Sequence, residues 1–233
     1  VKFQTGVPKF DVSVFAEKAE YQKTNTGDAS GAESQLEMCS KLMLPFEVYP
    51  ELIACCEENH IRFLSSPFDP PCAAFLHDMG MHLWKIPSGE ITHFPMLKLI
   101  ASYGEPIIMS TGMATMEEIE TTLNYLRKNG AGEITLLHCN SEYSTPYPDA
   151  NIRAMFALKE KFGLEVGYSD HILGIEVPIA AAALGATIIE KHFTLDRTME
   201  GPDQISSIEP DELKRLVESI RHVEQALRSG VKN

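Results

Sequence analysis

The sequence predicts an α/β fold of the TIM (β/α)8 barrel type, in which parallel strands alternate with helices. Short apolar runs typical of buried strands are separated by amphipathic segments typical of helices, and this unit recurs every ~20–30 residues. Seven strands can be counted, each followed by a helix. A closed barrel of this type has eight strands. We therefore expect the first strand to lie before Val1 and to be missing from this chain.

The expected strands are short, and most of them turn polar at their C-terminal ends. They lie at residues 1–5, 62–66, 82–87, 106–110, 134–139, 165–168 and 186–191. Alternation along the first strand puts Lys2 and Gln4 on one face. Residues 8–38 show no regular pattern and are interpreted either as a flexible surface loop or as a loop over an active site.

The expected helices fill the spaces between the later strands. They lie at residues 44–59, 71–79, 94–103, 116–129, 151–162, 177–184 and 210–230. The helix after Thr115 is the best defined, because Thr115 and Glu118 form a capping box and Gly130 suits its C-terminal end. The last helix has an apolar stripe that we expect to be buried, formed by Leu213, Leu216, Val217, Ile220 and Leu227.

Composition excludes some classes of protein and favours others. A length of 233 residues with 44% apolar content is enough for one large core, and we predict a single barrel domain over residues 1–233. No apolar run approaches the ~20 residues of a membrane span. The net charge of −13 argues against a nucleic-acid partner. The five cysteines include no CxxC pair, so we interpret them as reduced core thiols of a cytoplasmic protein.

Polar residues at the strand ends predict an active site. In α/β enzymes the C-terminal ends of parallel strands carry the chemistry. His171 and His192 end two strands that we expect to be neighbours, so the two side chains can meet although 21 positions separate them (192 − 171 = 21). Imidazole is a common ligand of divalent transition metals. The alternative is that each histidine is a hydrogen-bonded structural residue.

The other strand ends suggest the chemistry of a substrate. Lys2 and Lys85, with several hydroxyls, suit a phosphate or carboxylate. Glu90 suits proton transfer or the binding of a sugar hydroxyl, and the histidines suit a metal that acts as a Lewis acid. Each group also has a structural explanation, since strand-end lysines are often solvated and Asp69 suits a helix cap. Together they predict a barrel enzyme acting on a small phosphorylated or carboxylated compound.

Eight motifs in one order resemble a known family. They are Lys2-Phe3-Gln4, Ser65-Ser66-Pro67-Phe68-Asp69, Lys85-Ile86-Pro87-Ser88-Gly89-Glu90, Ser110-Thr111-Gly112-Met113, His138-Cys139-Asn140-Ser141-Glu142-Tyr143, Gly167-Tyr168-Ser169-Asp170-His171, Glu190-Lys191-His192-Phe193 and Gly201-Pro202-Asp203. Over essentially the whole chain they resemble the sialic acid synthase family, the phosphoenolpyruvate-condensing barrels that make N-acetylneuraminate and related nonulosonates.

The resemblance implies a reaction. The methylene carbon of phosphoenolpyruvate attacks the aldehyde of open-chain N-acetylmannosamine, water adds at phosphoenolpyruvate C2, and phosphate leaves. The resemblance assigns catalysis to Glu90, His171 and His192, with the two histidines holding Mn²⁺ or Mg²⁺. The residues that it assigns to substrate binding are Lys2, Gln4, Ser66, Lys85, Ser88, Ser110, Asn140, Ser141, Tyr143, Ser169 and Asp203.

This chain departs from the family pattern in several places. Ser66 stands where threonine is frequent, Ser141 takes the position next to Asn140 where relatives bind the sugar, and Tyr143-Ser144 replaces tyrosine-proline. The family's first-strand glutamate and its C-terminal antifreeze-like domain have no counterpart here. Family members are dimers that exchange this domain, so we expect a homodimer for the full-length protein and leave open whether this chain turns over alone.

Three alternatives remain open. The acceptor is either N-acetylmannosamine or a 2,4-diacetamido-trideoxy sugar, which would make the protein a legionaminate or pseudaminate synthase. An aldolase-like barrel would instead use Lys85 or Lys191 as a Schiff base. A non-catalytic remnant would keep the phosphoenolpyruvate pocket and lack turnover.

Overall fold

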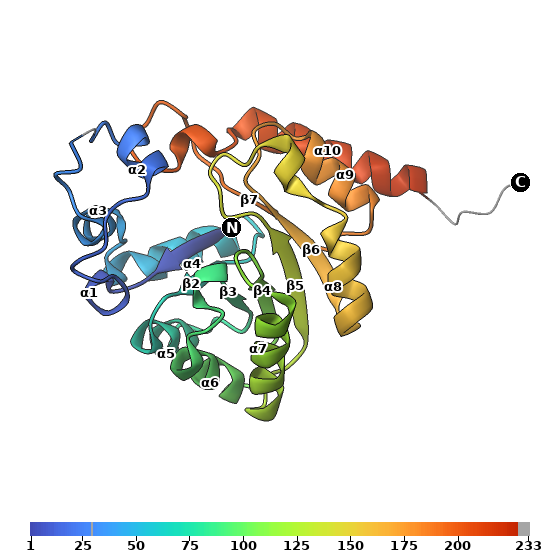
Figure 1. Cartoon of the computed structure of the whole chain (residues 1–233), viewed down its shortest axis with the longest axis horizontal. Coiled ribbons are helices and arrows are strands. Elements are labelled where there is room, and N and C mark those ends of the chain that lie inside the picture. Colours follow the sequence, from blue (N-terminus) through green and yellow to red (C-terminus); the bar gives the residue numbers. More distant parts are fainter. Residues whose placement is uncertain (29, 228–233) are drawn as a thin grey trace, which may run out of the picture. The chain divides into compact units, whose positions relative to one another are not determined.

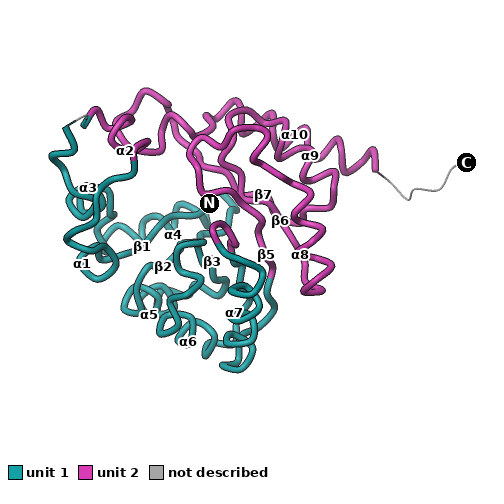
Figure 2. The backbone as a smooth tube through the Cα atoms, viewed as in Figure 1, with its two compact units in different colours: residues 1–19, 28–109, 114–134 teal, residues 20–27, 110–113, 135–233 magenta. Residues whose placement is uncertain are grey.

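The computed structural model describes residues 1–28 and 30–227 (Figure 1). It divides into two compact units (Figure 2). Unit 1 comprises residues 1–19, 28–109 and 114–134, and unit 2 comprises residues 20–27, 110–113 and 135–233.

Unit 1 is built from parallel strands with a helix after each of them. Strand β1 pairs in parallel with β2, and β3 pairs in parallel with β4. The strands are β1 (Lys2–Thr5), β2 (Leu64–Pro67), β3 (Trp84–Ile86) and β4 (Ile107–Ser110), the last of which ends in unit 2. The helices are α1 (Pro8–Asp11), α3 (Gln35–Leu42), η1 (Phe46–Val48), α4 (Tyr49–Glu58), α5 (Pro70–Asp78), η2 (Ser88–Glu90), α6 (Phe94–Ser102) and α7 (Met116–Lys128).

Two helices of unit 1, α5 and α7, begin at the caps that the sequence indicates. Asp69 accepts a hydrogen bond from the backbone of Cys72 and begins α5. Thr115 and Glu118 form the expected capping box of α7. The apolar sides of α5 and α6 are buried with Trp84, which has no exposed surface. Burial of such large side chains supplies the main favourable free energy of folding.

Unit 2 contains the remaining strands, again parallel and in sequence order. Strand β6 pairs with β5 on one side and with β7 on the other. The strands are β5 (Ile134–Cys139), which begins in unit 1, β6 (Glu165–Asp170) and β7 (Ile189–Lys191). The helices are α2 (Glu20–Asn25), η3 (Tyr147–Ala150), α8 (Ala154–Phe162), α9 (Glu176–Ala183), η4 (Gln204–Ser206) and α10 (Pro210–Leu227).

Small residues allow close packing in unit 2. A Cβ atom at Gly167 would lie 2.4 Å from the carbonyl oxygen of Ile188, so the approach of β6 to the segment before β7 requires glycine. The alanine-rich helix α9 packs against β6 and against α10 (Figure 1). These contacts fix the edge of unit 2 on which His171 and His192 lie.

All seven expected strands are present, with ends that differ by up to three residues from the predicted ones. One prediction is wrong: residues 8–38 are not an irregular loop, because they contain α1, α2 and the start of α3. The burial predicted for the last helix is also largely wrong. Leu216 is buried, whereas Leu213, Val217 and Leu227 are exposed, because the packing against α9 covers only part of the stripe. The expected end at Gly230 lies outside the described residues.

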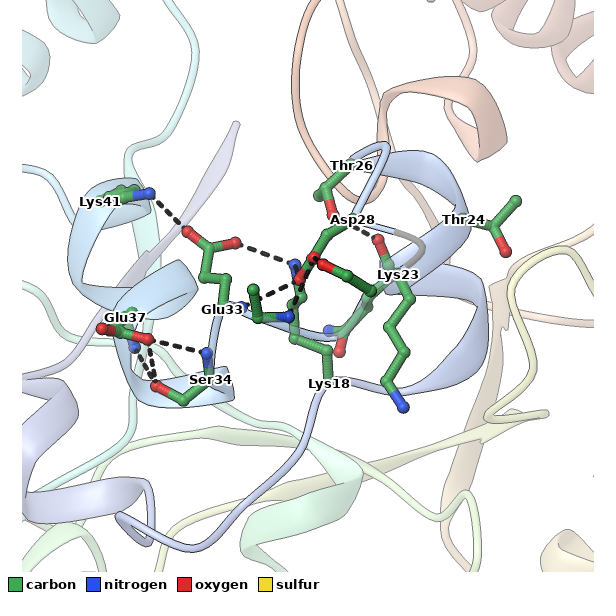
Figure 3. Close-up of polar contacts among 12 residues, drawn as sticks. Lys18, Lys23, Thr24, Thr26, Asp28, Glu33, Ser34, Glu37 and Lys41 are labelled. Atoms are coloured by element: carbon green, nitrogen blue, oxygen red, sulfur yellow. Dashed lines mark hydrogen bonds and ion pairs between the residues drawn. The ribbon is translucent and has the colours of Figure 1, made fainter.

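A network of charged groups orders the segment between α1 and α3. The ammonium of Lys18, which is buried, lies 2.8 Å from Asp28 and 2.9 Å from Glu33 (Figure 3). Asp28 also accepts hydrogen bonds from the backbone of Ala32 and Glu33, and Glu33 pairs with Lys41 of α3. These interactions lie between residues distant in sequence, which explains why a local pattern did not reveal an ordered segment.

Two further observations bear on the class of protein. None of the described helices is both long enough and apolar enough to pass through a lipid bilayer. The cysteines are not all core residues as expected, because Cys55 is exposed on α4 while Cys56, Cys72 and Cys139 are buried.

Candidate active site

The predicted site residues form two groups, one in each unit. The unit 1 group consists of Lys2, Gln4, Ser66, Lys85, Ser88 and Glu90. The unit 2 group consists of Ser110, Asn140, Ser141, Tyr143, Ser169, His171, His192 and Asp203.

In unit 1, strand register separates the polar residues into two faces. Thr5 Oγ1 lies 2.7 Å from both the hydroxyl of Tyr49, on α4, and Ser65 Oγ, so this face of β1 and β2 is directed to the helix. Gln4 is paired with Ser66 across the two strands. Because side chains alternate along a strand, Gln4 and Ser66 project from the face opposite to Tyr49.

Two buried side chains, one on β2 and one on β3, suit the binding of an anion. Ser66 is buried, and its Oγ has no hydrogen-bond partner among the described residues. Lys85 is 2% exposed and lies between the fully buried Trp84 and Ile86 of β3. The Lys85 ammonium donates to the carbonyl of Ile86 at 3.3 Å. Buried polar groups normally have partners, so the Ser66 hydroxyl indicates a ligand or an ordered water. A buried ammonium and a buried hydroxyl are both donors to a phosphate or carboxylate.

Two acidic side chains of unit 1 interact electrostatically: Glu90 of η2, which follows β3, and Asp11 of α1. Glu90 Oε2 accepts a hydrogen bond from His93 Nδ1 at 2.7 Å. Asp11 is exposed as a residue, but its carboxyl lies against Gly6. Partial burial, followed by the carboxylates of Asp69 and Glu90, raises the pKa of Asp11 to about 6. Glu90 is therefore part of a small acid–base cluster.

In unit 2, the register of β6 and β7 brings the two histidines together. Ser169 pairs with Glu190, and Ser169 Oγ donates to Glu190 Oε1 at 2.7 Å. His171 and His192 each follow two positions later and share this face. Their ring centroids are 5.4 Å apart, with an angle of 65° between the ring planes.

The tautomer of His171 follows from its hydrogen bond. Its Nδ1 lies 2.5 Å from the backbone oxygen of Asn140, which can only accept, so Nδ1 carries the proton. Burial lowers the pKa of His171, which favours the neutral imidazole. Nε2 then keeps its lone pair for a ligand, the arrangement that metal-binding histidines use.

Aromatic contacts fix the two imidazoles. The ring of Tyr143 stacks on His171 at 4.1 Å and meets His192 edge-on at 5.1 Å. Tyr21 of α2 stacks on Tyr143 at 5.4 Å. Burial raises the pKa of the Tyr143 hydroxyl, so it stays protonated at neutral pH and can donate a hydrogen bond.

Asp203 completes the unit 2 group. Its Oδ2 lies 3.9 Å from His192 Nδ1, and its Oδ1 is a buried atom without a partner among the described residues. Burial raises the pKa of this carboxyl. A buried acceptor without a partner indicates a donor that the protein does not supply, such as a substrate hydroxyl.

The remaining unit 2 residues differ in burial and in whether their side chains already form hydrogen bonds within the protein. Ser110 and Ser169 are buried at the ends of β4 and β6, whereas Ser141 is exposed. The side chain of Asn140 is used within its own loop, where it accepts from the backbone of Glu142 and donates to the carbonyl oxygen of Asp149 at 3.4 Å. Asn140 therefore acts on the site through its backbone oxygen.

Lys191 does not share the face of the histidines. Its ammonium forms a buried ion pair with Asp170 at 2.5 Å and donates to the carbonyl of Ile172. An ammonium held in this way is a poor nucleophile, because a Schiff base requires the neutral amine. The geometry argues against Lys191 as a Schiff-base residue.

Sequence reasoning gave two residues no role in the site, although one of them, Glu190, stands in one of the eight motifs. Glu190 precedes His192 by two positions, so strand alternation alone would have placed it on the same face. Tyr21 lies in the segment interpreted as irregular, and no local signal connects it with Tyr143.

The two imidazoles fit a divalent metal as part of its ligand set. Both nitrogen donors lie on one face of neighbouring strands, and the His171 ring is oriented by a backbone carbonyl. Imidazole favours transition-metal ions, whereas Mg²⁺ is usually held by oxygen ligands. The two imidazoles therefore suit a transition-metal ion better than Mg²⁺, and they do not select Mn²⁺ among such ions.

Comparisons with known proteins show what the chain is similar to. Residues 1–232 match the model of the NeuB family. The chain is 50% identical over 235 aligned positions to N,N'-diacetyllegionaminic acid synthase of Campylobacter jejuni, covering all of this chain and 69% of that protein. It spans 65% to 69% of the length of this and two further curated relatives.

Solved structures show the same fold. The N-acetylneuraminic acid synthetase of Leptospira borgpetersenii superposes with a TM-score of 0.83 at 33% identity, over all of this chain and 75% of that one. A truncated 3-deoxy-D-arabino-heptulosonate 7-phosphate synthase of Thermotoga maritima superposes with a TM-score of 0.69 at 17% identity, over 97% of this chain and 88% of that one, and this likeness concerns the fold alone. The predicted α/β fold of the TIM-barrel type is confirmed.

Proposed function

Because the chain belongs to the NeuB family, we propose that it condenses phosphoenolpyruvate with an N-acetylmannosamine-type sugar aldehyde and water to give N-acetylneuraminate and phosphate. The observation that carries this proposal is the pair of imidazoles of His171 and His192 beside Tyr143. The resemblance of the motifs and the names of the relatives support it.

The unit 1 group would bind phosphoenolpyruvate. Lys2 and Lys85 offset the negative charge of the substrate, and Ser66 Oγ supplies a buried donor. Ser88 at the start of η2 adds a hydroxyl donor. The resemblance of the motifs assigns substrate binding to Ser110 and Ser169 as well. Such charge-assisted hydrogen bonds contribute about 1.5–3 kcal/mol each.

The unit 2 group would bind the sugar. Tyr143 donates from its hydroxyl, and Asp203 accepts from hydroxyls of the sugar through the oxygen that has no partner among the described residues. Ser141 supplies a further polar group, and the resemblance of the motifs assigns substrate binding to Gln4 as well. Asn140 orients His171 through its backbone oxygen rather than contacting the sugar with its side chain.

The bonds that form and break follow from the substrates. Carbon C3 of phosphoenolpyruvate bonds to the aldehyde carbon, whose oxygen takes a proton. Water oxygen bonds to C2 and becomes the ketone oxygen as the C2–O bond to phosphate breaks. Of its two protons, one balances the proton taken by the aldehyde oxygen and the other leaves with the phosphate. Glu90, hydrogen-bonded to His93, is positioned as a carboxylate that moves a proton or holds a sugar hydroxyl.

His171 and His192 would hold the Mn²⁺ or Mg²⁺ ion. Such an ion supplies Lewis-acid polarisation of the aldehyde. The chain's own contribution is to keep His171 neutral through burial and to orient its ring through Asn140. Tyr143 restricts both rings by direct contact.

A second candidate acceptor is a 2,4-diacetamido-trideoxy sugar, which would make the protein a legionaminate synthase. The specific observation in its favour is the 50% identity to the Campylobacter jejuni enzyme of that name. The two acceptors differ in a hydroxyl against an acetamido or methyl group. Both reactions use the same groups of unit 1.

The test combines each sugar with phosphoenolpyruvate that carries ¹⁸O in its C–O–P bridge, in the presence of Mn²⁺. The expected result is a nonulosonic acid of the matching mass, with the ¹⁸O in the released phosphate. Unlabelled phosphate would reject the proposed bond cleavage. For a chain without turnover, crystals soaked with Mn²⁺ should show an anomalous peak between His171 and His192, and no peak at saturation would remove the metal assignment.

A further inference from the structure

A second group of metal-ligating side chains lies in unit 1, at the N-terminal ends of β3 and β4. His77 is near the end of α5, His82 stands two residues before β3, and Glu105 stands two residues before β4. Their ligand atoms all lie within 4.8 Å of one another. One helix and two segments that precede strands therefore bring two imidazoles and one carboxylate together.

The carboxylate of Glu105 is held in a fixed orientation. Its Oε2 accepts a hydrogen bond from the indole Nε1 of Trp84 at 2.7 Å, and Trp84 is fully buried. The other oxygen, Oε1, is hydrogen-bonded to Nδ1 of His82 and lies 4.0 Å from Nε2 of His77. One oxygen is thus fixed by the core, and the other faces both imidazoles.

The ring of His77 is fixed as well. It stacks on Tyr103 with 3.9 Å between the ring centroids and 9° between the planes. Its Nδ1 lies 3.8 Å from the carboxylate of Asp78, beyond hydrogen-bond distance, and its Nε2 is the nitrogen nearer to Glu105. Stacking on Tyr103 is therefore the contact that orients the ring.

We propose that His77 Nε2, His82 Nδ1 and Glu105 Oε1 form a solvent-open binding site for one divalent transition-metal ion of the Zn²⁺ class. Two imidazoles and one carboxylate are a known zinc ligand set that leaves a fourth position for water. Bonds of about 2.0–2.1 Å in tetrahedral geometry place ligand atoms about 3.3 Å apart. The His77–Glu105 distance of 4.0 Å is longer than this and the His82–Glu105 contact is shorter, so small side-chain rotations suffice.

Binding replaces the proton that His82 shares with Glu105. Nδ1 of His82 becomes a ligand, and the proton it carried can be taken up at Nε2, because the His82 side chain is 69% exposed. The ion then joins the end of α5 to the starts of β3 and β4. It stabilises this end of unit 1 without contact with the proposed reaction, since Ser88 and Glu90 follow the opposite end of β3.

The experiment uses the chain with His171→Ala and His192→Ala, which removes the proposed catalytic ligands. Titration with Co²⁺ is followed by visible absorption and with Zn²⁺ by calorimetry. We expect one equivalent to bind, and each of His77→Ala, His82→Ala and Glu105→Gln to weaken binding more than about 100-fold. The control is Glu133→Gln. Glu133 also stands just before a strand, β5, but is not one of the three proposed ligands.

Two further outcomes decide the proposal. Trp84→Phe removes the hydrogen bond that holds Glu105 and should weaken Zn²⁺ binding about 10- to 100-fold. His82 is exposed, so His82→Ala tests the site without loss of core packing. Absence of a bound equivalent, or binding that all three ligand variants leave unchanged, would overturn the site and would leave the proposed synthase function untouched.

Discussion

Lys85 is the residue whose environment best matches a role in anion binding. It is a lysine buried on β3 between two fully buried apolar residues. Its ammonium donates to the backbone carbonyl of Ile86 at 3.3 Å, and an ammonium carries three donors that suit an anion. In the proposed function, that anion is phosphoenolpyruvate.

Lys85→Met keeps the length of the side chain and removes its charge. We expect the Kd of phosphoenolpyruvate to rise about 10- to 150-fold, which corresponds to one charge-assisted hydrogen bond. Calorimetry measures this without turnover. Lys98→Met, on the exposed side of α6, is the control and should leave the Kd unchanged. Equal affinities of the wild type and Lys85→Met would remove Lys85 from the site.

Asp203→Asn tests the acceptor side of the site. Asparagine keeps the shape but loses the charge, so hydrogen bonds from sugar hydroxyls weaken at the oxygen that has no partner among the described residues. We expect about 10-fold weaker binding of the acceptor sugar, with the Kd of phosphoenolpyruvate unchanged. Asp211→Asn, exposed at the start of α10, is the control. A change in both affinities would point to a general distortion of the site.

His138 gives the molecule a defined pH dependence. Burial lowers its pKa in the folded state, against the smaller opposing effect of its hydrogen bond to the carbonyl of Ala150. In the unfolded chain the pKa of His138 is about 6.5, so on acidification His138 takes up its proton at a higher pH in the unfolded chain than in the folded protein. The stabilisation is therefore complete above about pH 6.5 and is lost as the pH falls toward the folded pKa.

His138→Gln should flatten this dependence, because glutamine keeps a donor for Ala150 and does not titrate. Between pH 7 and pH 5 we expect the unfolding free energy of the wild type to fall more steeply than that of the variant, by up to about 1.4 kcal/mol per pH unit. Urea unfolding at several pH values measures it, and His222→Gln on exposed α10 serves for comparison. Parallel curves for wild type and His138→Gln would contradict the assignment.

At the scale of elements, the sequence predicted what local patterns determine. Buried strands and capped helices were placed within a few residues, because apolar periodicity and residues such as Thr115 act locally. Strand order and alternation also predicted that His171 and His192 meet. The order of residues 8–38 depends on Lys18 and its distant partners, and the stacking of Tyr21 on Tyr143 depends on where α2 lies. No local sequence pattern predicts either of these two features.

The order of the segment between α1 and α3 should depend on the buried ammonium of Lys18. Lys18→Met removes the ion pairs with Asp28 and Glu33 and leaves their carboxylates without this cation (Figure 3). We expect limited proteolysis to cleave within residues 16–34 much faster than in the wild type, while the thermal unfolding of the remainder stays cooperative. Lys23→Met, which removes an exposed pair with Glu20, should not change cleavage. Equal resistance of Lys18→Met and wild type would show that other contacts order the segment.

At the scale of the whole molecule, two electrostatic effects oppose one another. The net charge of −13 repels a substrate that carries several negative charges, and a few lysines attract it locally. Salt separates the two effects, because the Debye length falls from about 30 Å at 0.01 M to about 8 Å at 0.15 M. Distant carboxylates are screened over this range, whereas a lysine in contact with the substrate remains well within the Debye length.

Affinity for phosphoenolpyruvate should therefore increase with moderate salt. We expect its Kd to fall by a factor of about two to ten between 10 mM and 150 mM salt, while the Kd of the uncharged acceptor sugar stays constant. Calorimetry at saturating Mn²⁺ measures both. A Kd of phosphoenolpyruvate that rises with salt would mean that the local field of Lys2 and Lys85 extends beyond direct contact and outweighs the charge of the whole chain. In that case the anion site would act by long-range steering, and Lys85→Met should remove the salt dependence.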